Sequence, residues 1–362
     1  GDNALTKYAE KYEGVKLKKI IVKQEEIDNS KNFISKSLKD SIKIAKKNIE
    51  KFHISQKSKS DHIIIEKGVE CWQEKRPIEK VGLYIPGGSA PLFSTILMLA
   101  IPAKIAGCDE IIICTPPNPK GEIPPVILYT CYLCGISKIY KVGGAQAIAA
   151  MTFGTESIPG VYKIFGPGNQ YVTSAKQYAT KFKISIDLPA GPSELLIYAD
   201  ETAIPKYVAS DFLSQTEHGP DSQVILVTTN EKIIDPIIKE IKKQINYLNK
   251  KEFIRKSIQN SKIIYFDLRE RAVKYINDYA PEHYIICCKE EEYFIQNLKN
   301  AGSVFIGNYS CESIGDYASG TNHTLPTNGY AKQYSGVNLD SFLKQISFQK
   351  ITAEGIRKIG PA

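Results

Sequence analysis

The run Val81-Gly-Leu-Tyr-Ile85, followed at once by Pro86-Gly-Gly88, begins a repeating pattern of short β-rich runs and helical segments. Similar β-rich runs follow at residues 110–114, 138–142, 161–165 and 184–187. Helical patterns separate these runs, for example at residues 95–106 and 146–153. Strands that alternate with helices predict a parallel sheet that is covered by helices on both faces.

The same pattern returns in the second half of the chain. Its β-rich runs lie at residues 194–198, 223–228, 262–266, 283–288 and 303–306. The simplest account is an α/β fold with two doubly wound, incomplete Rossmann-like parallel-sheet units, joined near Ala190-Gly-Pro192. We therefore predict a first unit over residues 81–191 and a second over residues 192–327.

The two ends of the chain lack this rhythm. Residues 1–80 predict an N-terminal helical arm that also contains a lysine-rich strand at 18–23, a long amphipathic helix from about 31 to 52, and a short strand at 62–66. After Gly320 the sequence is polar and contains one short helical stretch.

The charge balance does not indicate a nucleic-acid binder. Lys and Arg number 47 against 39 Asp and Glu, a net charge of +8, and the excess lysines are spread thinly. Between Lys36 and Lys51 the apolar residues recur at helical spacing, so the lysines form a solvated helix face. No stretch interleaves basic and aromatic residues as a single-strand binder does.

The cysteines and the apolar runs indicate a cytoplasmic protein. Several of the eight cysteines lie inside apolar runs, which is typical of free thiols in a reducing compartment. Cys131-Tyr-Leu-Cys134 has no second half, so two buried thiols on one helical face are favoured over zinc binding or redox work. The longest apolar run, around residues 92–101, is too short to span a bilayer. We expect no leader and no membrane partner.

Three glycine turns in the first unit each follow a strand and open a helix. They end at Gly88, Gln146 and Asn169. None of them is a G-x-G-x-x-G motif, so their spacing alone is weak evidence for a dinucleotide. Ligands nevertheless bind at the carboxyl ends of strands in a doubly wound sheet, and Tyr84, Gln146 and Asn169 all lie at such ends.

A metal site is one interpretation of the segment 210–220. Gln215 and His218 stand three residues apart on a predicted helix, so both side chains leave the same face. The alternative is a His⁺ that is favoured by the helix dipole beside a solvated Gln. Asp316 follows the last strand of the second unit and could face the same cleft. Such a set of oxygen and nitrogen donors suits Zn²⁺ or Mn²⁺.

The pair Glu282-His283 is a candidate for proton transfer. It lies in a predicted loop between a helix and a strand, where adjacent side chains can both face one cleft. A carboxylate beside an imidazole can act as general base and proton shuttle. The alternative is a solvated loop pair without a catalytic role.

Several long motifs together resemble those of the L-histidinol dehydrogenase family. The longest is Ile186-Asp-Leu-Pro-Ala-Gly-Pro-Ser-Glu-Leu195, which runs on through Gln215-Thr-Glu-His-Gly219. The others are Gly87-Gly-Ser-Ala-Pro91, Gly143-Gly-Ala-Gln-Ala-Ile148, Phe165-Gly-Pro-Gly-Asn169, Ala280-Pro-Glu-His283 and Gly315-Asp-Tyr-Ala-Ser-Gly-Thr-Asn-His323. The match runs from the first residue to the last, in one order and without large gaps.

The resemblance implies a zinc-dependent homodimer that oxidises L-histidinol to L-histidine in two NAD⁺ steps, through an aldehyde held in the site. It also implies a role for each matching residue. The zinc ligands would be Gln215, His218 and Asp316, and these with Ser193, His283 and His323 would contact the substrate. The base and proton relay would be Glu282 and His283, and the NAD contacts would be Tyr84, Gln146 and Asn169.

The family continues past the last residue of this chain into a small C-terminal domain. That domain is implied to supply a zinc-binding histidine and a substrate-binding glutamate to the partner subunit. Residues 328–362 would then be the incomplete start of a dimerisation extension. We expect its sparse apolar residues to pack on a second subunit, namely Tyr330, Tyr334, Leu339, Phe342 and Ile346. The 362 residues alone should dimerise weakly and show little activity.

Two other functions fit the same sequence. One is a paralogue that oxidises another small amino- or sulfo-alcohol, although His323 favours histidinol. The other is a non-catalytic fragment that acts as a binding or scaffold module. The retained Glu282-His283 pair argues against that last interpretation.

Overall fold

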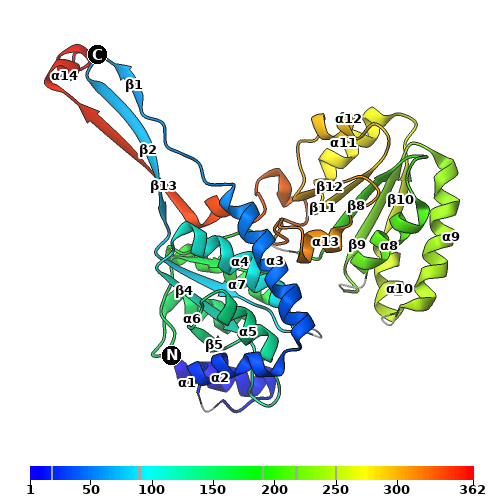
Figure 1. The fold of residues 1–362 in the computed structure, drawn as a ribbon, viewed down its shortest axis with the longest axis horizontal. Coiled ribbons are helices and arrows are strands. Elements are labelled where there is room, and N and C mark those ends of the chain that lie inside the picture. The colour runs from blue at the N-terminus through cyan, green and yellow to red at the C-terminus, as the bar shows by residue number, and fades with distance from the viewer. Residues whose placement is uncertain (18, 89–90, 190, 217–218, 249–250) are drawn as a thin grey trace. The chain divides into compact units, whose positions relative to one another are not determined.

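The computed structural model describes residues 1–17, 19–88, 91–189, 191–216, 219–248 and 251–362. The chain divides into two compact units, whose secondary structure is drawn in Figure 1. The first unit comprises residues 1–165, 182–185 and 338–362, and the second comprises residues 166–181 and 186–337. Each unit is a mixed α/β structure around a five-stranded sheet, which confirms the predicted fold class.

The sheet that begins in the first unit has the strand order β5-β4-β3-β6-β7. Strand β3 pairs in parallel with β4 and with β6, and β4 pairs in parallel with β5. The strands lie close to the predicted positions: β3 Lys80–Tyr84, β4 Glu110–Thr115, β5 Ile139–Lys141, β6 Lys163–Phe165 and β7 Ser185–Ile186. The helices between them are α4 Phe93–Ala106, α5 Pro125–Leu133 and α6 Gly144–Phe153. Strand β3 forms because Val81 and Leu83 are fully buried at its centre.

The second sheet repeats this order as β10-β9-β8-β11-β12, with every pair parallel. Its strands are β8 Glu194–Ala199, β9 Gln223–Thr228, β10 Lys262–Tyr265, β11 His283–Cys287 and β12 Ser303–Ile306. Alternate residues of β8 pack on opposite faces, against α8 Pro205–Thr216, α9 Ile234–Gln244 and α10 Lys251–Asn260 on one side, and against α11 Arg269–Tyr279 and α12 Glu291–Gln296 on the other. The second unit is therefore doubly wound, as predicted (Figure 1).

The N-terminal segment differs from the prediction in two places. Residues 19–23 form no regular strand, and Lys18 lies outside the described residues. Only an isolated bridge joins Ile21 to Tyr140. The long helix, α3 Lys36–Ile54, begins later than predicted because Ser35 caps it by accepting the Leu38 N–H at 3.2 Å. Helices α1 Asp2–Tyr8 and α2 Gln24–Asn29 precede it.

A separate antiparallel sheet in the first unit joins residues 63–77 to residues 343–351, in the last segment of that unit. It has the order β1-β2-β13, with bounds β1 Ile63–Glu66, β2 Val69–Pro77 and β13 Leu343–Ile351. Helix α14, Ala353–Ile359, follows β13 (Figure 1). The sequence predicted β1 but neither β2 nor β13. Both missed strands carry charged or polar residues on two largely accessible faces, so they lack a buried stripe.

The expectation that the C-terminal apolar residues need a second subunit was wrong for two of them. Leu339 and Phe342 are 1% and 0% exposed within their own unit. The ring of Phe342 stacks on that of Phe165, with 4.0 Å between the ring centroids. Tyr334 and Ile346 are 38% and 40% exposed, so their expected packing on a partner stays a prediction.

The cysteines are free thiols, as their positions inside apolar runs predicted. All eight cysteines are free, and Cys131 and Cys134 are buried at the end of α5. Among the described residues, every helix is too short or too polar to cross a bilayer.

The burial of Phe342 predicts a large loss of stability on truncation. Phe342→Ala should lower the free energy of unfolding by about 3–5 kcal/mol, because it leaves a cavity against Phe165. Ile346→Ala, on the more exposed strand β13, should cost less than about 1 kcal/mol. Urea unfolding of both variants measures the difference. Equal losses would contradict the packing described here.

Candidate functional site

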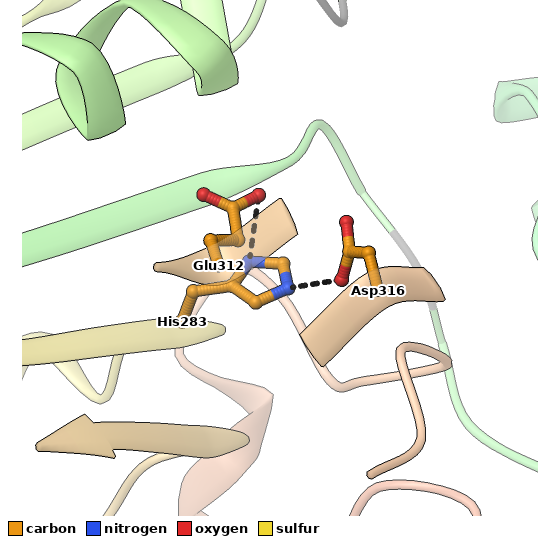
Figure 2. A group of neighbouring side chains, drawn as sticks. All are labelled: His283, Glu312 and Asp316. Carbon is orange, nitrogen blue, oxygen red and sulfur yellow. Dashed lines mark ion pairs between the residues drawn. The ribbon is translucent and has the colours of Figure 1, made fainter. Parts of the chain in front are cut away.

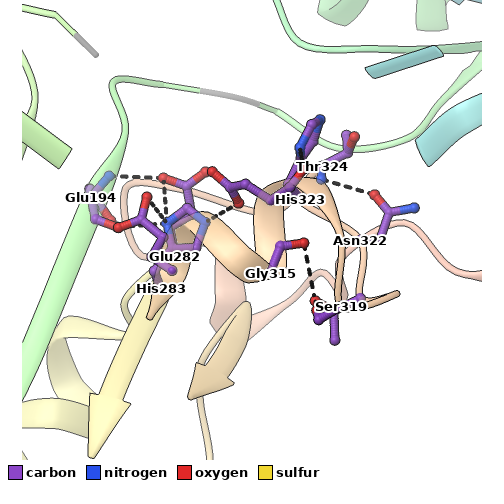
Figure 3. Close-up of polar contacts among 11 residues, drawn as sticks. Glu194, Glu282, His283, Gly315, Ser319, Asn322, His323 and Thr324 are labelled. Atoms are coloured by element: carbon purple, nitrogen blue, oxygen red, sulfur yellow. Dashed lines mark hydrogen bonds and ion pairs between the residues drawn. The ribbon is translucent and has the colours of Figure 1, made fainter. Parts of the chain in front are cut away.

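A cluster of charged side chains lies at the amino-terminal edge of the second sheet (Figure 3). Glu194 is the first residue of β8, His283 is the first residue of the neighbouring strand β11, and Glu282 precedes it. Glu312 and Asp316 lie one turn apart on helix α13, Glu312–Tyr317. We call these five residues the acid cluster. Four of its members are less than 9% exposed, and Glu194 is half-buried.

The imidazole of His283 lies between the two carboxyl groups of α13 (Figure 2). Its Nδ1 is 3.1 Å from the backbone oxygen of Glu194, and 3.8 Å from Oε1 of Glu312. Because a carbonyl oxygen only accepts, Nδ1 carries the hydrogen and the neutral ring has its lone pair on Nε2. Nε2 is 3.6 Å from Oδ1 of Asp316 and makes no hydrogen bond within the described residues.

Backbone groups of the strand edge hold the carboxylates. Oε2 of Glu282 accepts the Glu194 N–H at 2.8 Å and is 3.7 Å from Nδ1 of His283. Oε1 of Glu194 accepts the Asn328 N–H at 2.9 Å, while its Oε2 is buried without a partner. Glu282 and His283 are therefore held close together, as a base and proton relay would require.

Gln215 enters the same cluster from the last turn of α8 and is fully buried. The surrounding donors and acceptors assign the orientation of its amide: with the nitrogen toward Glu312, it donates to that carboxyl group, with 3.2 Å to Oε2 and a closer approach to Oε1, whereas the opposite orientation makes none of these bonds. Its amide oxygen lies 3.0 Å from the Glu194 nitrogen and so shares that one N–H with Oε2 of Glu282. Gln215 is thus linked through Glu312 to the helix that carries Asp316.

Crowding of carboxyl groups around one ring shifts their protonation. Burial raises the pKa of Glu194 and of Glu282 to about 7, and that of Glu312 to about 8. Burial alone would lower the pKa of His283, but the neighbouring carboxylates of Glu312 and Glu282 raise it to about 10. In the absence of a cation the acid cluster therefore retains protons that exposed groups would release.

The predicted substrate residues of the second unit line shared cavities. Ser193, Glu282 and His323 line a cavity of about 70 Å³. Nδ1 of His323 is 2.9 Å from the backbone oxygen of Asp316, and burial lowers the pKa of this histidine. Ser193 and Asn169 line a larger groove of about 650 Å³ at the start of helix α7, Gln170–Ala179.

Of the three predicted NAD residues, Asn169 lies in the second unit, and Tyr84 and Gln146 belong to the first unit. Tyr84 is the last residue of β3, and its hydroxyl accepts the Gly144 N–H at 3.0 Å. Gln146 lies in the first turn of α6, directly against Gly144. Gly144 has φ +66°, and an added Cβ there would lie 2.7 Å from Oε1 of Gln146, so this turn requires glycine. Asn169, in the second unit, caps α7 by accepting the Tyr171 and Val172 N–H groups, both at 3.1 Å.

Three expectations about the site need correction or lie outside the structure. His283 is a strand residue and is only 3% exposed, so neither a polar loop nor a solvated pair describes it. Asp316 lies in α13 rather than in a loop after the last strand. His218 lies outside the described residues.

Sequence reasoning missed Glu312, although it contacts both Gln215 and His283. A single Glu in Cys311-Glu-Ser-Ile-Gly-Asp316 carries no motif of its own. The only available signal is the spacing of four residues to Asp316, which places both carboxyl groups on one face of a helix.

Comparison with known proteins identifies the family. A family model described as histidinol dehydrogenase matches residues 1–362, which is the whole chain. The chain belongs to the histidinol dehydrogenase family.

Individual relatives agree with this membership. Histidinol dehydrogenase of Bacteroides thetaiotaomicron is 54% identical, over 100% of this chain and 85% of its own length. The crystal structure of histidinol dehydrogenase from Elizabethkingia anophelis has a TM-score of 0.98 at 55% identity, and covers 99% of this chain and 83% of its own. An NAD⁺ complex of aldehyde dehydrogenase from Bacillus cereus, 16% identical with a TM-score of 0.54 over 86% of this chain and 76% of its own, shares the fold alone.

The donor set of this histidinol dehydrogenase family member fits a divalent cation. One nitrogen of His283 and one oxygen each of Glu312 and Asp316 lie within 4.8 Å of one another. Nitrogen and oxygen donors of this kind suit zinc. A cation would also neutralise the excess of buried carboxylates, which the protein otherwise neutralises with protons.

The raised pKa values predict an unusual pH dependence of the metal-free protein. Between about pH 4.5 and 8 the folded state holds more protons than the unfolded state, so the free energy of unfolding should fall as pH rises. Glu312→Gln should make this fall shallower, whereas the exposed control Glu291→Gln should leave it unchanged.

Urea unfolding at pH 5 and pH 8, with and without zinc, measures the effect. Zinc should add more stability at pH 8 than at pH 5, because at pH 8 fewer protons of the acid cluster have to leave when the ion binds. A metal-free wild type whose fall from pH 5 to pH 8 equals that of Glu312→Gln would contradict the assignment.

Proposed function

We propose that this enzyme oxidises L-histidinol to L-histidine, the last step of histidine biosynthesis, with two NAD⁺ and one Zn²⁺ per active site. The observation that carries the proposal is the ring of His283: its buried Nε2 makes no hydrogen bond to any described residue, and its Nδ1 lies 3.7 Å from Oε2 of Glu282. Family membership supports the substrate, since relatives named histidinol dehydrogenase are about half identical over the whole chain. The direct test is the formation of two NADH for each histidinol consumed.

The proposed zinc ligands from this chain are Gln215, His218 and Asp316. When bound, the ion would hold the imidazole and amine nitrogens of the substrate and so orient the carbinol carbon. Support comes from the buried carboxyl groups of Glu282, Glu312 and Asp316, which crowd around the one ring of His283 and would be stabilised by a cation. Clamping a substrate in this way can lower a barrier by several kcal/mol.

In the first oxidation Nε2 of His283 would take the hydroxyl proton while the carbinol carbon loses a hydride to NAD⁺. The Nδ1–H bond to the Glu194 carbonyl sets the tautomer that this step needs, and a bound cation would offset the carboxylate charges that otherwise raise the pKa of His283 to about 10, so that the ring is neutral. The aldehyde then stays in the site, where Ser193 and His323 are the proposed substrate contacts. Both residues line a cavity with Glu282.

In the second oxidation Glu282 would take a proton from the water that adds to the aldehyde carbon. The hydrate then loses a second hydride to NAD⁺, and its hydroxyl proton leaves through His283. Burial raises the pKa of Glu282 to about 7, which suits a base that must accept and release a proton near neutral pH. The proposed NAD contacts are Tyr84, Gln146 and Asn169.

We also propose that the protein is a cytoplasmic homodimer. The edge strand β1 exposes Ile63, Ile64 and Ile65 at 58%, 76% and 63%, an apolar strip that a partner subunit would cover. Eight free cysteines are typical of a reducing compartment.

Replacement of Glu282 should separate the two oxidations. Glu282→Gln should slow the aldehyde step by about 10²–10⁴-fold, because only that step needs an activated water, and should slow the alcohol step much less. Single-turnover NADH formation from histidinol and from histidinaldehyde measures the two steps in the same variant. An unchanged aldehyde step would remove Glu282 from this role.

A charge on β1 should weaken the dimer. Ile64→Glu should raise the dimer dissociation constant at least about tenfold, since the carboxylate would be buried without a partner. Tyr247→Glu, at an exposed apolar residue of the second unit, is the matched control and should change nothing. Sedimentation equilibrium decides between a weakened and an unaffected dimer. Equal association of both variants would exclude β1 from the interface.

A further inference from the structure

The amide of Gln215 is oriented by two partners on opposite sides. Its NH₂ group faces the carboxyl oxygens of Glu312, and its oxygen faces the Glu194 N–H at 3.0 Å. The reversed amide would place its oxygen against carboxylate oxygens and its NH₂ against an N–H group. Because the side chain is fully buried, water cannot relieve such a mismatch.

We infer that Glu312 is a positioning residue, which holds the NH₂ group of Gln215 so that the carbonyl oxygen is the end presented to the metal ion. The inference rests on the proposed zinc-dependent function. An amide can ligate a cation only through its oxygen, and that oxygen has a second lone pair beside the one that accepts the Glu194 N–H. Without Glu312 the amide could rotate and present two N–H donors instead.

Glu312 has a donor atom within 4.8 Å of those of His283 and Asp316, but its carboxyl group is already engaged by Gln215. Both of its oxygens accept from the Gln215 NH₂ group, and it is only 1% exposed. The ring nitrogen that makes no hydrogen bond, Nε2 of His283, faces Asp316 and not Glu312. Helix α13 thus carries two carboxyl groups one turn apart with different tasks: Asp316 faces the ion, and Glu312 orients another ligand.

The test measures zinc affinity of the metal-stripped full chain by competition with a chelator of known affinity. Glu312→Ala should weaken zinc binding about 10- to 100-fold, the usual range for a residue that orients a ligand. Gln215→Ala should weaken it by at least as much, and the double variant should be no weaker than Gln215→Ala alone. Glu312→Gln, which keeps an acceptor oxygen, should lose less than about tenfold. Ser313→Ala, exposed on the same helix, should bind like the wild type.

The other outcomes assign failure to one proposal or the other. Losses that add in the double variant would mean that Glu312 contacts the ion itself, and unchanged affinity in Glu312→Ala would mean a purely structural role; either overturns the inference. A wild type that binds no zinc would overturn the zinc site itself. If Glu312→Ala does not fold by circular dichroism, the same cycle with Glu312→Gln replaces it, and additive losses there overturn the inference in the same way.

Discussion

The main constraint on the structure is the burial of four carboxyl groups around one imidazole. They belong to Glu194, Glu282, Glu312 and Asp316, and the imidazole is that of His283. Unpaired buried charges are strongly destabilising, so each group needs a donor or a proton. The first residues of two parallel strands provide much of this, because Glu194 offers its N–H to Glu282 and its carbonyl to His283. The end of α8 and the whole of α13 are placed to complete the same network.

The two edges of these parallel sheets suit ligands of opposite charge. At a carboxyl edge the chain enters helices, whose amino ends favour anions; Tyr84, Gln146 and Asn169 all lie at such turns. At the amino edge of the second sheet α8 ends, and the carboxyl end of a helix favours cations, although α13 begins at the same edge with Glu312. The acid cluster, with Gln215 in the last turn of α8, lies at that edge. The two edges of such a sheet therefore present helix ends of opposite polarity.

The sequence was most informative where burial imposes a pattern. Strands β3 and β8 were predicted correctly because both consist of apolar runs that are buried on both faces of a sheet. Strand β13 was missed because its apolar residues are few and its faces are accessible, so only its partner β2 makes it a strand. The prediction that Phe342 packs on a second subunit was wrong for a related reason. Its packing partner in the same unit, Phe165, lies far away in the sequence. Glu312 was missed because its importance comes from what it contacts, and contact is not visible in composition.

The pairing of β2 with β13 has a consequence for the order of events during synthesis. Residues 69–77 leave the ribosome before the second unit is made, yet their hydrogen-bonding partners, residues 343–351, emerge only after it. Nearly the whole second unit is made in between, and its own sheet needs no residue after 306. A growing chain therefore carries one nearly finished unit while the first still holds an open edge on β2. Closing that edge is a long-range contact, the kind that forms slowly and leaves a strand exposed to other chains until it does.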